Sequence, residues 1–246
     1  MRLAALLSGG KDSVFTIYKC VQAGHDLSCV VNLTSPAADG SELDSYCFQT
    51  VGDNLISGIA DCLNVPLVQG TIRGSAINQN LDYGITKGDE VEDLYNVLLQ
   101  AKTLHNVEAV CAGALFSTYQ KLRVESVCDR LGLACICPIW ETDQLELLHQ
   151  MKAVGLEAIM IKVACLGLDR RHLGKSVTEQ LPMLQELTSK YAINPAGEGG
   201  EYESLTLFCP GIYRKRLVVE ESEVVTHSDD FGAPVYYLKV LKWRTE

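Results

Sequence analysis

Leu3-Ala4-Ala5-Leu6-Leu7-Ser8-Gly9-Gly10-Lys11-Asp12-Ser13 decides the fold, because it joins an apolar strand to a helix through two glycines flanked by serines. Small residues at such a turn let backbone N–H groups close on an anion, and a helix beginning near Ser13 adds the positive end of its dipole. Lys11 supplies a full positive charge. The stretch therefore predicts a phosphate-binding loop. The plain alternative is an ordinary strand-to-helix turn in which Asp12 and Ser13 cap the helix.

The spacing of the glycines excludes the two commonest nucleotide-binding motifs. A Walker A loop needs four residues between its first glycine and the GK[ST] group, and a dinucleotide-binding turn needs GxGxxG. Ser8-Gly9-Gly10-Lys11-Asp12-Ser13 instead resembles the PP-loop of the ATP pyrophosphatases. That resemblance implies a loop that holds the terminal pyrophosphate of ATP while the α-phosphorus is attacked, so that pyrophosphate leaves and AMP remains.

The composition is that of a globular protein with an acidic surface. The chain has 246 residues, 47% of them hydrophobic and 21% charged, and a formal net charge of −10, which excludes disordered and fibrous classes. No apolar run approaches the length of a bilayer span, and Met1-Arg2 leads directly into the first strand. We therefore expect a cytoplasmic protein with no membrane segment and no targeting peptide. The negative charge argues against nucleic acid as a partner and suits a cationic substrate.

The cysteines give no sign of a metal site or of a disulfide framework. The ten cysteines are scattered through apolar strands and helices and form no CxxC pair. Cys135 and Cys137 alternate around Ile136 in a predicted strand, so they point to one face, but the neighbouring sequence offers no further ligands. We expect buried thiols that pack as small hydrophobic side chains, and no structural zinc.

Apolar segments alternate with helical periodicity through the first two thirds of the chain. Their Val, Ile, Leu and Cys content is typical of parallel strands covered on both faces, and the stripes between them indicate core-facing helices. The pattern predicts an α/β fold with a doubly wound, mostly parallel sheet of the PP-loop (HUP-like) type, whose ligand lies beyond the carboxyl ends of the strands. The expected strands are Arg2–Leu7, Leu27–Leu33, Pro66–Ile72, Ala109–Leu115 and Leu133–Ile139, and the helical stripes begin at Val14, Val51, Val91 and Val124.

The pattern changes after Trp140, where we place a domain boundary. Residues 1–140 are expected to form the ATP-binding domain, and residues 141–246 a smaller C-terminal α+β domain for substrate recognition. Helical periodicity around Gln144–Ala153 and Ser176–Lys190 alternates there with strand-like segments separated by turn residues. These strand-like segments are Ala158–Cys165, Tyr202–Phe208, Lys215–Val219 and Val235–Lys242.

A second unusual stretch, Pro195-Ala196-Gly197-Glu198-Gly199-Gly200-Glu201-Tyr202-Glu203-Ser204, precedes one of these strands. We call it the Gly-Glu loop. Its glycines permit unusual backbone angles or the close approach of a ligand, and its carboxylates and tyrosine concentrate negative charge and a π-face. A flexible surface loop with solvated glutamates is an equally good interpretation of the composition. Crowded carboxylates repel one another unless a cation relieves them, which favours a binding role in a chain that also has a nucleotide loop.

The resemblance to a particular family rests on several blocks that occur in a fixed order. Together they are similar to the diphthine-ammonia ligases over nearly the whole chain, whereas the PP-loop alone indicates only the superfamily. The chain looks like the short form, without the further C-terminal domains of some fungal members. The blocks are Ser8–Ser13, Glu42–Tyr46 with Gln49–Gly52, Thr71–Gly74, Gly88–Leu94, Gly113-Ala114 with Ser117, Tyr119-Gln120 and Arg123–Glu125, and Gly197–Glu203.

The resemblance implies an ATP-dependent amide ligase that performs the last step of diphthamide synthesis. Diphthine is a modified histidine of elongation factor 2 that carries a carboxylate and a trimethylammonium group. Its carboxylate would be adenylated and then attacked by ammonia, with AMP and pyrophosphate released. ATP and Mg²⁺ are the expected cofactors, and elongation factor 2 bearing diphthine and ammonium are the expected partners.

Each candidate residue has an expected role in this reaction. The catalytic candidates are Lys11, Asp12, Glu201 and Glu203. Asp12 is also the expected contact to Mg²⁺, which the ATP phosphates would largely hold. The nucleotide-binding candidates are Ser8, Gly9, Gly10, Lys11, Asp12 and Ser13 for the phosphates and Asn32, Leu33, Gly113 and Ala114 around adenosine. The substrate-binding candidates are Glu198 and Tyr202 in the Gly-Glu loop, with Asp44, Tyr46, Arg73, Glu90 and Tyr119 lining the remaining groove.

Several of these roles have structural alternatives. Asp44, Tyr46, Arg73, Glu90 and Tyr119 fit capping or strand-end packing nearly as well, and Arg123 with Glu125 fits a solvated ion pair on a helix. The Gly-Glu loop fits either trimethylammonium or ammonium. At the level of the whole chain, the alternatives are another ATP-pyrophosphatase amidotransferase or thiolase, a nucleotide-binding sensor without catalysis, and a tail that serves as a protein-interaction module.

Overall fold

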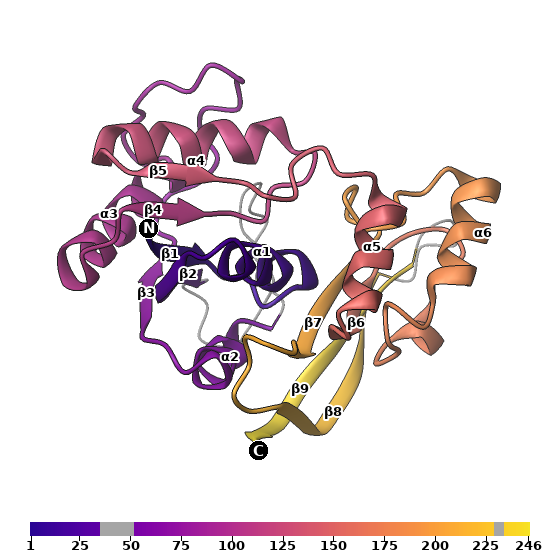
Figure 1. Ribbon diagram of the computed structural model, residues 1–246. Coiled ribbons are helices and arrows are strands. Elements are labelled where there is room, and N and C mark those ends of the chain that lie inside the picture. Colours follow the sequence, from indigo (N-terminus) through magenta and orange to yellow (C-terminus); the bar gives the residue numbers. More distant parts are fainter. Residues whose placement is uncertain (35–51, 229–233) are drawn as a thin grey trace.

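The predicted phosphate-binding loop, residues 8–13, follows the central strand of the larger sheet. The computed structural model describes residues 1–34, 52–228 and 234–246. Five parallel strands lie in the order β3-β2-β1-β4-β5 (Figure 1). The order changes direction between β1 and β4, which is where doubly wound sheets bind their ligands, and the predicted fold class is confirmed. The strands are β1 (Arg2–Leu6), β2 (Asp26–Thr34), β3 (Leu67–Thr71), β4 (Ala109–Cys111) and β5 (Ala134–Ile136).

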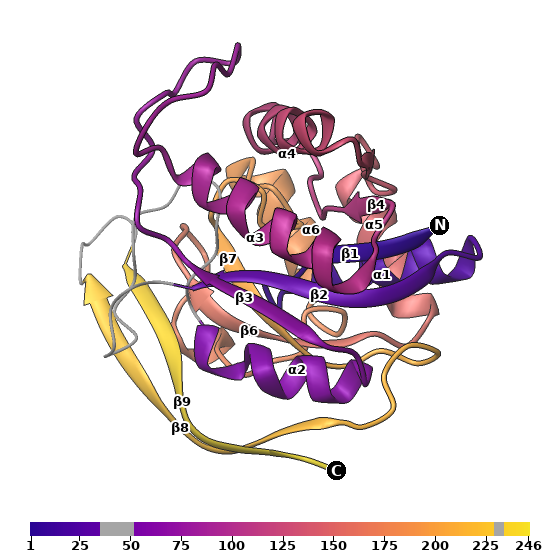
Figure 2. The same ribbon diagram turned by 90° about the vertical axis from the view of Figure 1, so that its left-hand side faces the viewer.

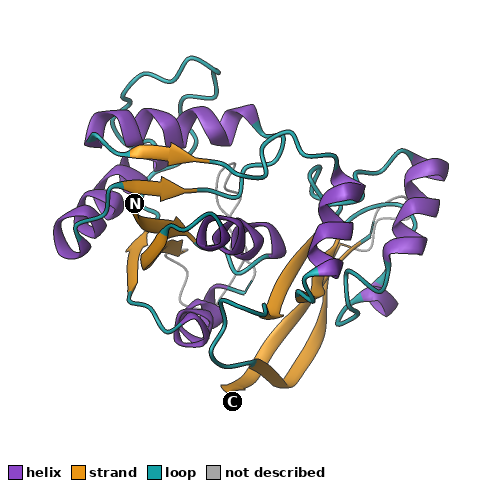
Figure 3. Ribbon diagram, in the orientation of Figure 1, coloured by secondary structure: helices purple, strands orange, loops and turns teal. Residues whose placement is uncertain are grey.

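Helices cover both faces of this sheet (Figures 1 and 3). The helices α1 (Lys11–Gln22) and α2 (Ile56–Leu63), the second preceded by the short turn η1 (Asp53–Leu55), share one core with the sheet. The helices α3 (Glu90–His105) and α4 (Thr118–Leu131) share the other. The apolar stripes expected from the sequence are the buried faces of these helices, as at Ile17, Ile59, Leu98 and Val127.

The second sheet is antiparallel and lies beside the first (Figures 1 and 2). Its strands follow the order β7-β6-β9-β8. They are β6 (Glu157–Val163), β7 (Tyr202–Phe208), β8 (Leu217–Ser228) and β9 (Val235–Thr245), and the helices of this part are α5 (Gln144–Ala153), η2 (Arg170–His172) and α6 (Leu181–Tyr191). The helix expected from Ser176 begins at Leu181, because Ser176 forms a β-bridge with Ile159.

One hydrophobic cluster runs through both parts of the molecule. It joins α1, α2 and the first sheet to β6, β7 and α5, with Ile59, Leu147 and Met160 among its members. Strand β7 also reaches the end of β1, where the Thr206 N–H donates to the Gly9 carbonyl at 2.9 Å. The two parts of the chain on either side of Trp140 therefore share a hydrophobic core, and their division into two domains stays a prediction. Within the described ranges, no helix has the length and apolar character needed to cross a membrane.

Gly58 is where α2 meets the second sheet, and it yields a stability prediction. A Cβ at this position would lie 2.5 Å from the Trp243 ring and 3.1 Å from the Leu217 side chain. Alanine should gain about 1 kcal/mol of helix propensity, but overpacking costs about 1–3 kcal/mol, so Gly58→Ala should lower the free energy of unfolding. Urea titration would measure this change.

Two further variants make the test specific. Gly84→Ala adds a methyl group where the described chain places no atom within 4 Å, so its stability should stay close to wild type. In a Trp243→Leu background, Gly58→Ala should cost much less, because the ring that it strikes is gone. A Gly58→Ala protein as stable as wild type would contradict this account of the contact.

Candidate functional site

The PP-loop, residues 8–13, turns from β1 into α1 and leaves two backbone amides open. Gly9 has a φ of 83°, a region that favours glycine, and Gly10 caps the helix. An α-helix leaves its first four N–H groups without intrahelical acceptors. Here Gly10 N–H donates to Ser8 Oγ at 3.3 Å and Lys11 N–H donates to Ser204 Oγ at 3.1 Å. Among the described residues, the amides of Asp12 and Ser13 are therefore the two first-turn donors without an acceptor, and they are open to a phosphate.

Lys11 is a buried cation that connects the two sheets. Only 2% of the residue is exposed. Its Nζ donates to Asp12 Oδ2 at 2.7 Å and to the Ala196 carbonyl at 2.5 Å, and lies 5.2 Å from the centre of the Tyr202 ring. Burial by itself lowers the pKa of the Lys11 ammonium, but the Asp12 carboxylate and the neighbouring Tyr202 and Glu198 outweigh it and hold the pKa above its ordinary value. The ammonium therefore stays charged.

Asp12 offers the oxygen best suited to a metal ion. Its Oδ2 pairs with Lys11, whereas its Oδ1 is buried and has no hydrogen-bond partner in the part of the chain that the structure describes. Asp12 also lines the cavity next to the PP-loop. Among the described residues, no group of three or more His, Cys, Asp or Glu side chains could hold a metal by itself. A single carboxylate of this kind fits Mg²⁺ that is bound mainly by nucleotide phosphates.

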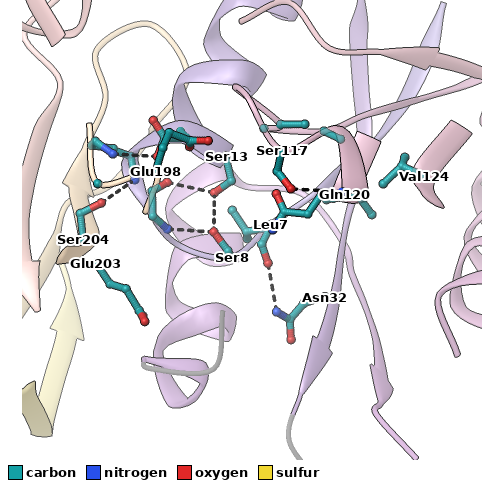
Figure 4. A pocket seen from close by; sticks show the side chains of 18 of the residues that line it. Leu7, Ser8, Ser13, Asn32, Ser117, Gln120, Val124, Glu198, Glu203 and Ser204 are labelled. Atoms are coloured by element: carbon teal, nitrogen blue, oxygen red, sulfur yellow. Dashed lines mark hydrogen bonds and ion pairs between the residues drawn. The ribbon is translucent and has the colours of Figure 1, made fainter. Parts of the chain in front are cut away.

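The cavity beside the PP-loop has a volume of about 490 Å³ and is lined by both sheets. Figure 4 shows Ser204 and Glu203 on one side, Asn32, Ser117 and Gln120 on the other, and Ser8 and Ser13 between them. We call it the PP-loop cavity. Its size is within the range of small-molecule sites. All the predicted phosphate and adenosine candidates except Gly9 line it, namely Ser8, Gly10, Lys11, Asp12, Ser13, Asn32, Leu33, Gly113 and Ala114.

Gly113 lets the loop after β4 approach the first turn of α1. A Cβ there would lie 3.0 Å from the Ser13 backbone nitrogen and 3.1 Å from the Asp12 carbonyl carbon. On the neighbouring strand, Asn32 Nδ2 donates to the Leu7 carbonyl at 3.0 Å, while Asn32 Oδ1 accepts from Gln69 at 3.0 Å. The Asn32 side chain therefore fixes the chain just before Ser8, and its carboxamide is already engaged.

The Gly-Glu loop closes one side of the PP-loop cavity, and its glutamates do different things. Glu201 Oε1 accepts from the Asn194 backbone and side chain at 3.0 and 2.8 Å, and its Oε2 accepts from Gly199 N–H at 2.7 Å. Glu201 thus fastens the loop to itself and is not among the residues that line the cavity. Glu203 does line the cavity, and its Oε1 pairs with Lys162 at 3.1 Å.

Tyr202 and Glu198 fix the Gly-Glu loop in its place beside Lys11 and the loop after β4. The Tyr202 hydroxyl donates to the Pro195 carbonyl at 2.8 Å, and burial raises the pKa of that hydroxyl. Glu198 Oε2 accepts the Phe116 N–H at 3.2 Å, from the loop after β4. Burial, followed by repulsion from Asp12, raises the pKa of the Glu198 carboxyl, although Lys11 opposes the change.

Three of the predicted substrate residues, Arg73, Glu90 and Tyr119, are not brought to the cavity wall. Arg73 is exposed, Glu90 is buried at the start of α3, and Tyr119 packs its ring against Arg123. None of these three is among the residues that line the cavity. Asp44 and Tyr46 lie outside the described residues.

Arg123 is not the solvated ion-pair partner suggested by the sequence alone. Its side chain is fully buried, and its guanidinium donates to the carbonyls of Tyr119, Asn78 and Asn80. Glu125 pairs instead with Lys121, one helical turn away. In sequence, a helical Arg with a carboxylate two residues later resembles a surface pair. Two of the carbonyls that Arg123 binds, those of Asn78 and Asn80, lie in a distant loop that the local sequence does not reveal.

Three cavity residues lie within the sequence motifs, but the sequence alone assigned them no role: Ser204, Ser117 and Gln120. Ser204 ends the Gly-Glu loop and supplies the acceptor for Lys11 N–H. Ser117 caps α4 by accepting from Gln120 N–H at 3.2 Å, and both residues line the cavity. The serine-to-helix pattern of Ser117 is visible in the sequence as an N-cap, but its position at the cavity follows only from the sheet topology.

The fold and this site define a class of protein. A doubly wound sheet with an SGGKDS loop at the end of its first strand, open amides at a helix N-terminus and an adjoining cavity belongs to the ATP-pyrophosphatase type of nucleotide-binding proteins. The family model "Diphthamide synthase N-terminal domain" matches residues 1–135, and "Diphthamide synthase C-terminal domain" matches residues 143–236. The chain belongs to the diphthine–ammonia ligase family and is therefore a member of an enzyme family.

Similar proteins cover the chain almost completely. The diphthine–ammonia ligase of Danio rerio is 47% identical over 100% of this chain and 97% of its own length. The Homo sapiens protein of the same name is 45% identical over 100% of this chain and 93% of its own length. The Schizosaccharomyces pombe ligase is 47% identical over 98% of this chain, but the match spans only 39% of that longer protein.

The raised pKa of Glu198 yields a prediction of pH-dependent stability. A carboxyl whose pKa is raised by folding stabilises the protein below its unfolded pKa, and this contribution is lost as pH rises through the folded pKa. Glutamine is neutral at every pH and can still accept the Phe116 N–H through its carboxamide oxygen. Glu198→Gln should therefore unfold at higher urea concentration than wild type at pH 8, and the difference should shrink as pH falls towards 4. A difference independent of pH would contradict the assignment.

Proposed function

We propose that the protein catalyses the ATP-dependent amidation of diphthine on elongation factor 2, with ammonium as the nitrogen source and AMP and pyrophosphate as products. Membership of the diphthine–ammonia ligase family supports the reaction. The observation that carries the proposal is the position of the open Asp12 and Ser13 amides, at the same cavity that the Gly-Glu loop closes. A nucleotide anchored there would present its phosphorus to a substrate held by that loop.

The chemistry requires activation of the carboxylate, because direct attack by ammonia would have to expel oxide. A carboxylate oxygen attacks the α-phosphorus, the bond from that phosphorus to the bridging oxygen breaks, and pyrophosphate leaves. Ammonia, formed when ammonium gives up a proton, then attacks the acyl carbon of the adenylate. AMP departs with the former carboxylate oxygen, and the second proton lost from nitrogen completes the amide. The protein's part is to align the groups and to stabilise the leaving pyrophosphate.

The PP-loop residues Ser8, Gly9, Gly10, Lys11 and Ser13 would hold the β- and γ-phosphates, and Asn32, Leu33, Gly113 and Ala114 would surround adenosine. All of these residues except Gly9 line the cavity wall, which supports these roles. Asp12 would contact Mg²⁺ through its buried Oδ1, and the metal, when bound, would neutralise phosphate charge. The acidic chain supports no direct role for nucleic acid, and a translation factor as substrate favours a cytoplasmic reaction.

The Gly-Glu loop would recognise the cationic part of the substrate. Glu203 faces the cavity and Tyr202 lines it, so these two residues are the better candidates for trimethylammonium or ammonium, with Glu198 beside them. Glu201 would act indirectly, because its three hydrogen bonds hold the loop in shape. Asp44, Tyr46, Arg73, Glu90 and Tyr119 stay proposals for the outer substrate groove.

The nucleotide product tests the function. With diphthine-bearing elongation factor 2, ammonium and Mg-ATP, chromatography should detect AMP and pyrophosphate in a 1:1 ratio to amide, and no AMP without the protein substrate. Loss of one charge-stabilising donor typically costs about 10²- to 10³-fold in rate, so Lys11→Ala should lower AMP formation by that amount. Because Lys11 also tethers Ala196, a thermal melt must accompany it. ADP as the stoichiometric product would refute the mechanism, and binding of ATP without turnover would favour a sensor.

Glu203→Gln should impair the substrate more than the nucleotide. The proposed substrates are cations and ATP is an anion. The neutral side chain should therefore raise the activation free energy with diphthine-bearing elongation factor 2 by about 2 kcal/mol, which lowers kcat/KM roughly thirtyfold, and it should leave ATP affinity unchanged. Mass spectrometry of the elongation factor and calorimetry with ATP would measure the two effects. Glu223→Gln is the matched control, because it removes the same charge from an exposed pair with Lys239. Equal losses in turnover and ATP affinity would assign Glu203 to the nucleotide or the fold.

A further inference from the structure

The loop between β3 and α3, residues 72–89, projects from the body of the molecule (Figure 2). It carries three large aliphatic side chains into solvent: Ile77 is 54% exposed, Leu81 58% and Ile85 71%. Single exposed aliphatic residues are common on protein surfaces, but three on one projecting loop are a sign of a contact surface. We call this segment the β3–α3 loop.

Two carboxylates, the buried Asp89 and the half-buried Asp93, hold the β3–α3 loop in a defined shape. Asp89 is 1% exposed, and its Oδ2 accepts the N–H groups of Ile77 and Asn78 at 3.1 and 2.8 Å. Asp93 Oδ2 accepts from Arg73 and Gly74 at 2.7 and 2.8 Å. Gly74 packs so tightly that a Cβ would lie 2.6 Å from the Asp89 carbonyl carbon. A loop held in this way loses little conformational entropy when its exposed side chains are buried by a partner.

Arg123 connects this loop to the PP-loop cavity. The residue lines the cavity, and its guanidinium Nη2 donates to the carbonyls of Asn78 and Asn80 in the loop. Its charged face also lies 5.3 Å from the centre of the Tyr83 ring. The loop is therefore anchored in the wall of the reaction site, and a partner resting on it would lie at the rim of that site.

We propose that the β3–α3 loop is the docking element for the protein that carries the diphthine side chain. This inference rests on the proposed function. A cavity of about 490 Å³ admits a nucleotide and a side chain but excludes the body of a folded protein, which must rest on the rim. The loop is electrically neutral, with two cations (Arg73, Lys87) and two carboxylates (Asp82, Asp89), in a chain of net charge −10. Its contact with the partner is thus apolar and only weakly dependent on salt.

The test replaces the three aliphatic side chains by serine, Ile77→Ser, Leu81→Ser and Ile85→Ser. With the intact diphthine-bearing elongation factor and saturating ATP and ammonium, the KM for the factor should rise about tenfold for Ile85→Ser and on the order of a hundredfold for the triple variant, with kcat nearly unchanged. A short peptide bearing diphthine should be processed as by wild type, because it needs no docking. ATP affinity should also stay the same. Leu104→Ser, 60% exposed in the last turn of α3, is the matched control and should change nothing.

The outcomes separate this proposal from the proposed function. If wild type makes the amide and the triple variant has an unchanged KM for the intact factor, the docking role is wrong and the function stands. An altered oligomeric mass by sedimentation, with unchanged KM, would make the loop an interface between copies of this chain and would also overturn the proposal. If wild type forms no amide from either substrate, the proposed function fails. Binding of the intact factor to immobilised protein then decides: weaker binding by the triple variant supports docking, and equal or absent binding refutes it.

Discussion

The site depends on three hydrogen bonds that fasten the Gly-Glu loop and β7 to the PP-loop. Lys11 N–H donates to Ser204 Oγ, Lys11 Nζ donates to the Ala196 carbonyl, and Thr206 N–H donates to the Gly9 carbonyl. Without them the first turn of α1 would face solvent, and the cavity would lose one wall. The contact also uses up one of the four orphan amides of the helix, so the positions of the two open ones are set by the second sheet. Neither sheet builds the site alone.

Charge balance at this contact restricts what can enter. Lys11 is a buried cation beside Asp12 and Glu198, and Glu203 has a partner in Lys162. A triphosphate arriving at the Asp12 and Ser13 amides adds several negative charges next to two carboxylates. Repulsion at such short range in a partly buried site is costly, so the proposed Mg²⁺, or a proton taken up by Glu198, would lower the cost of nucleotide binding. Such a coupling would account for the buried Asp12 Oδ1, which has no hydrogen-bond partner among the described residues.

Local sequence patterns were enough for the fold and for the place of the PP-loop within it. Strands of the first sheet, helical stripes such as that of Leu98, and the PP-loop each follow from residues close together in the chain. The roles of Lys11, Glu201 and Arg123 do not. Lys11 meets Ala196 across 185 residues of sequence, and Arg123 meets Asn78 across 45. The sequence analysis expected a catalytic role for Glu201, whereas its hydrogen bonds to Asn194 and Gly199 make it a residue that holds the loop in shape. Side chains whose partners are distant backbone carbonyls or amides leave no periodic signal.

Arg123 illustrates why residue type in a cavity beside a PP-loop does not define the role of a side chain. An arginine in a nucleotide cavity suggests a phosphate ligand, since its planar fork suits bidentate binding of oxyanions. Here both terminal nitrogens are committed to carbonyls, and the guanidinium plane lies against Tyr119. A neutral carbonyl attracts a cation less strongly than a phosphate does. The hydrogen bonds of Arg123 to carbonyls are nevertheless strong, because the side chain is buried and water does not compete for it. The same burial makes Arg123 a rigid connection between the cavity wall and the β3–α3 loop. A lysine, with its single nitrogen, could not reach the three carbonyls that the planar guanidinium of Arg123 binds.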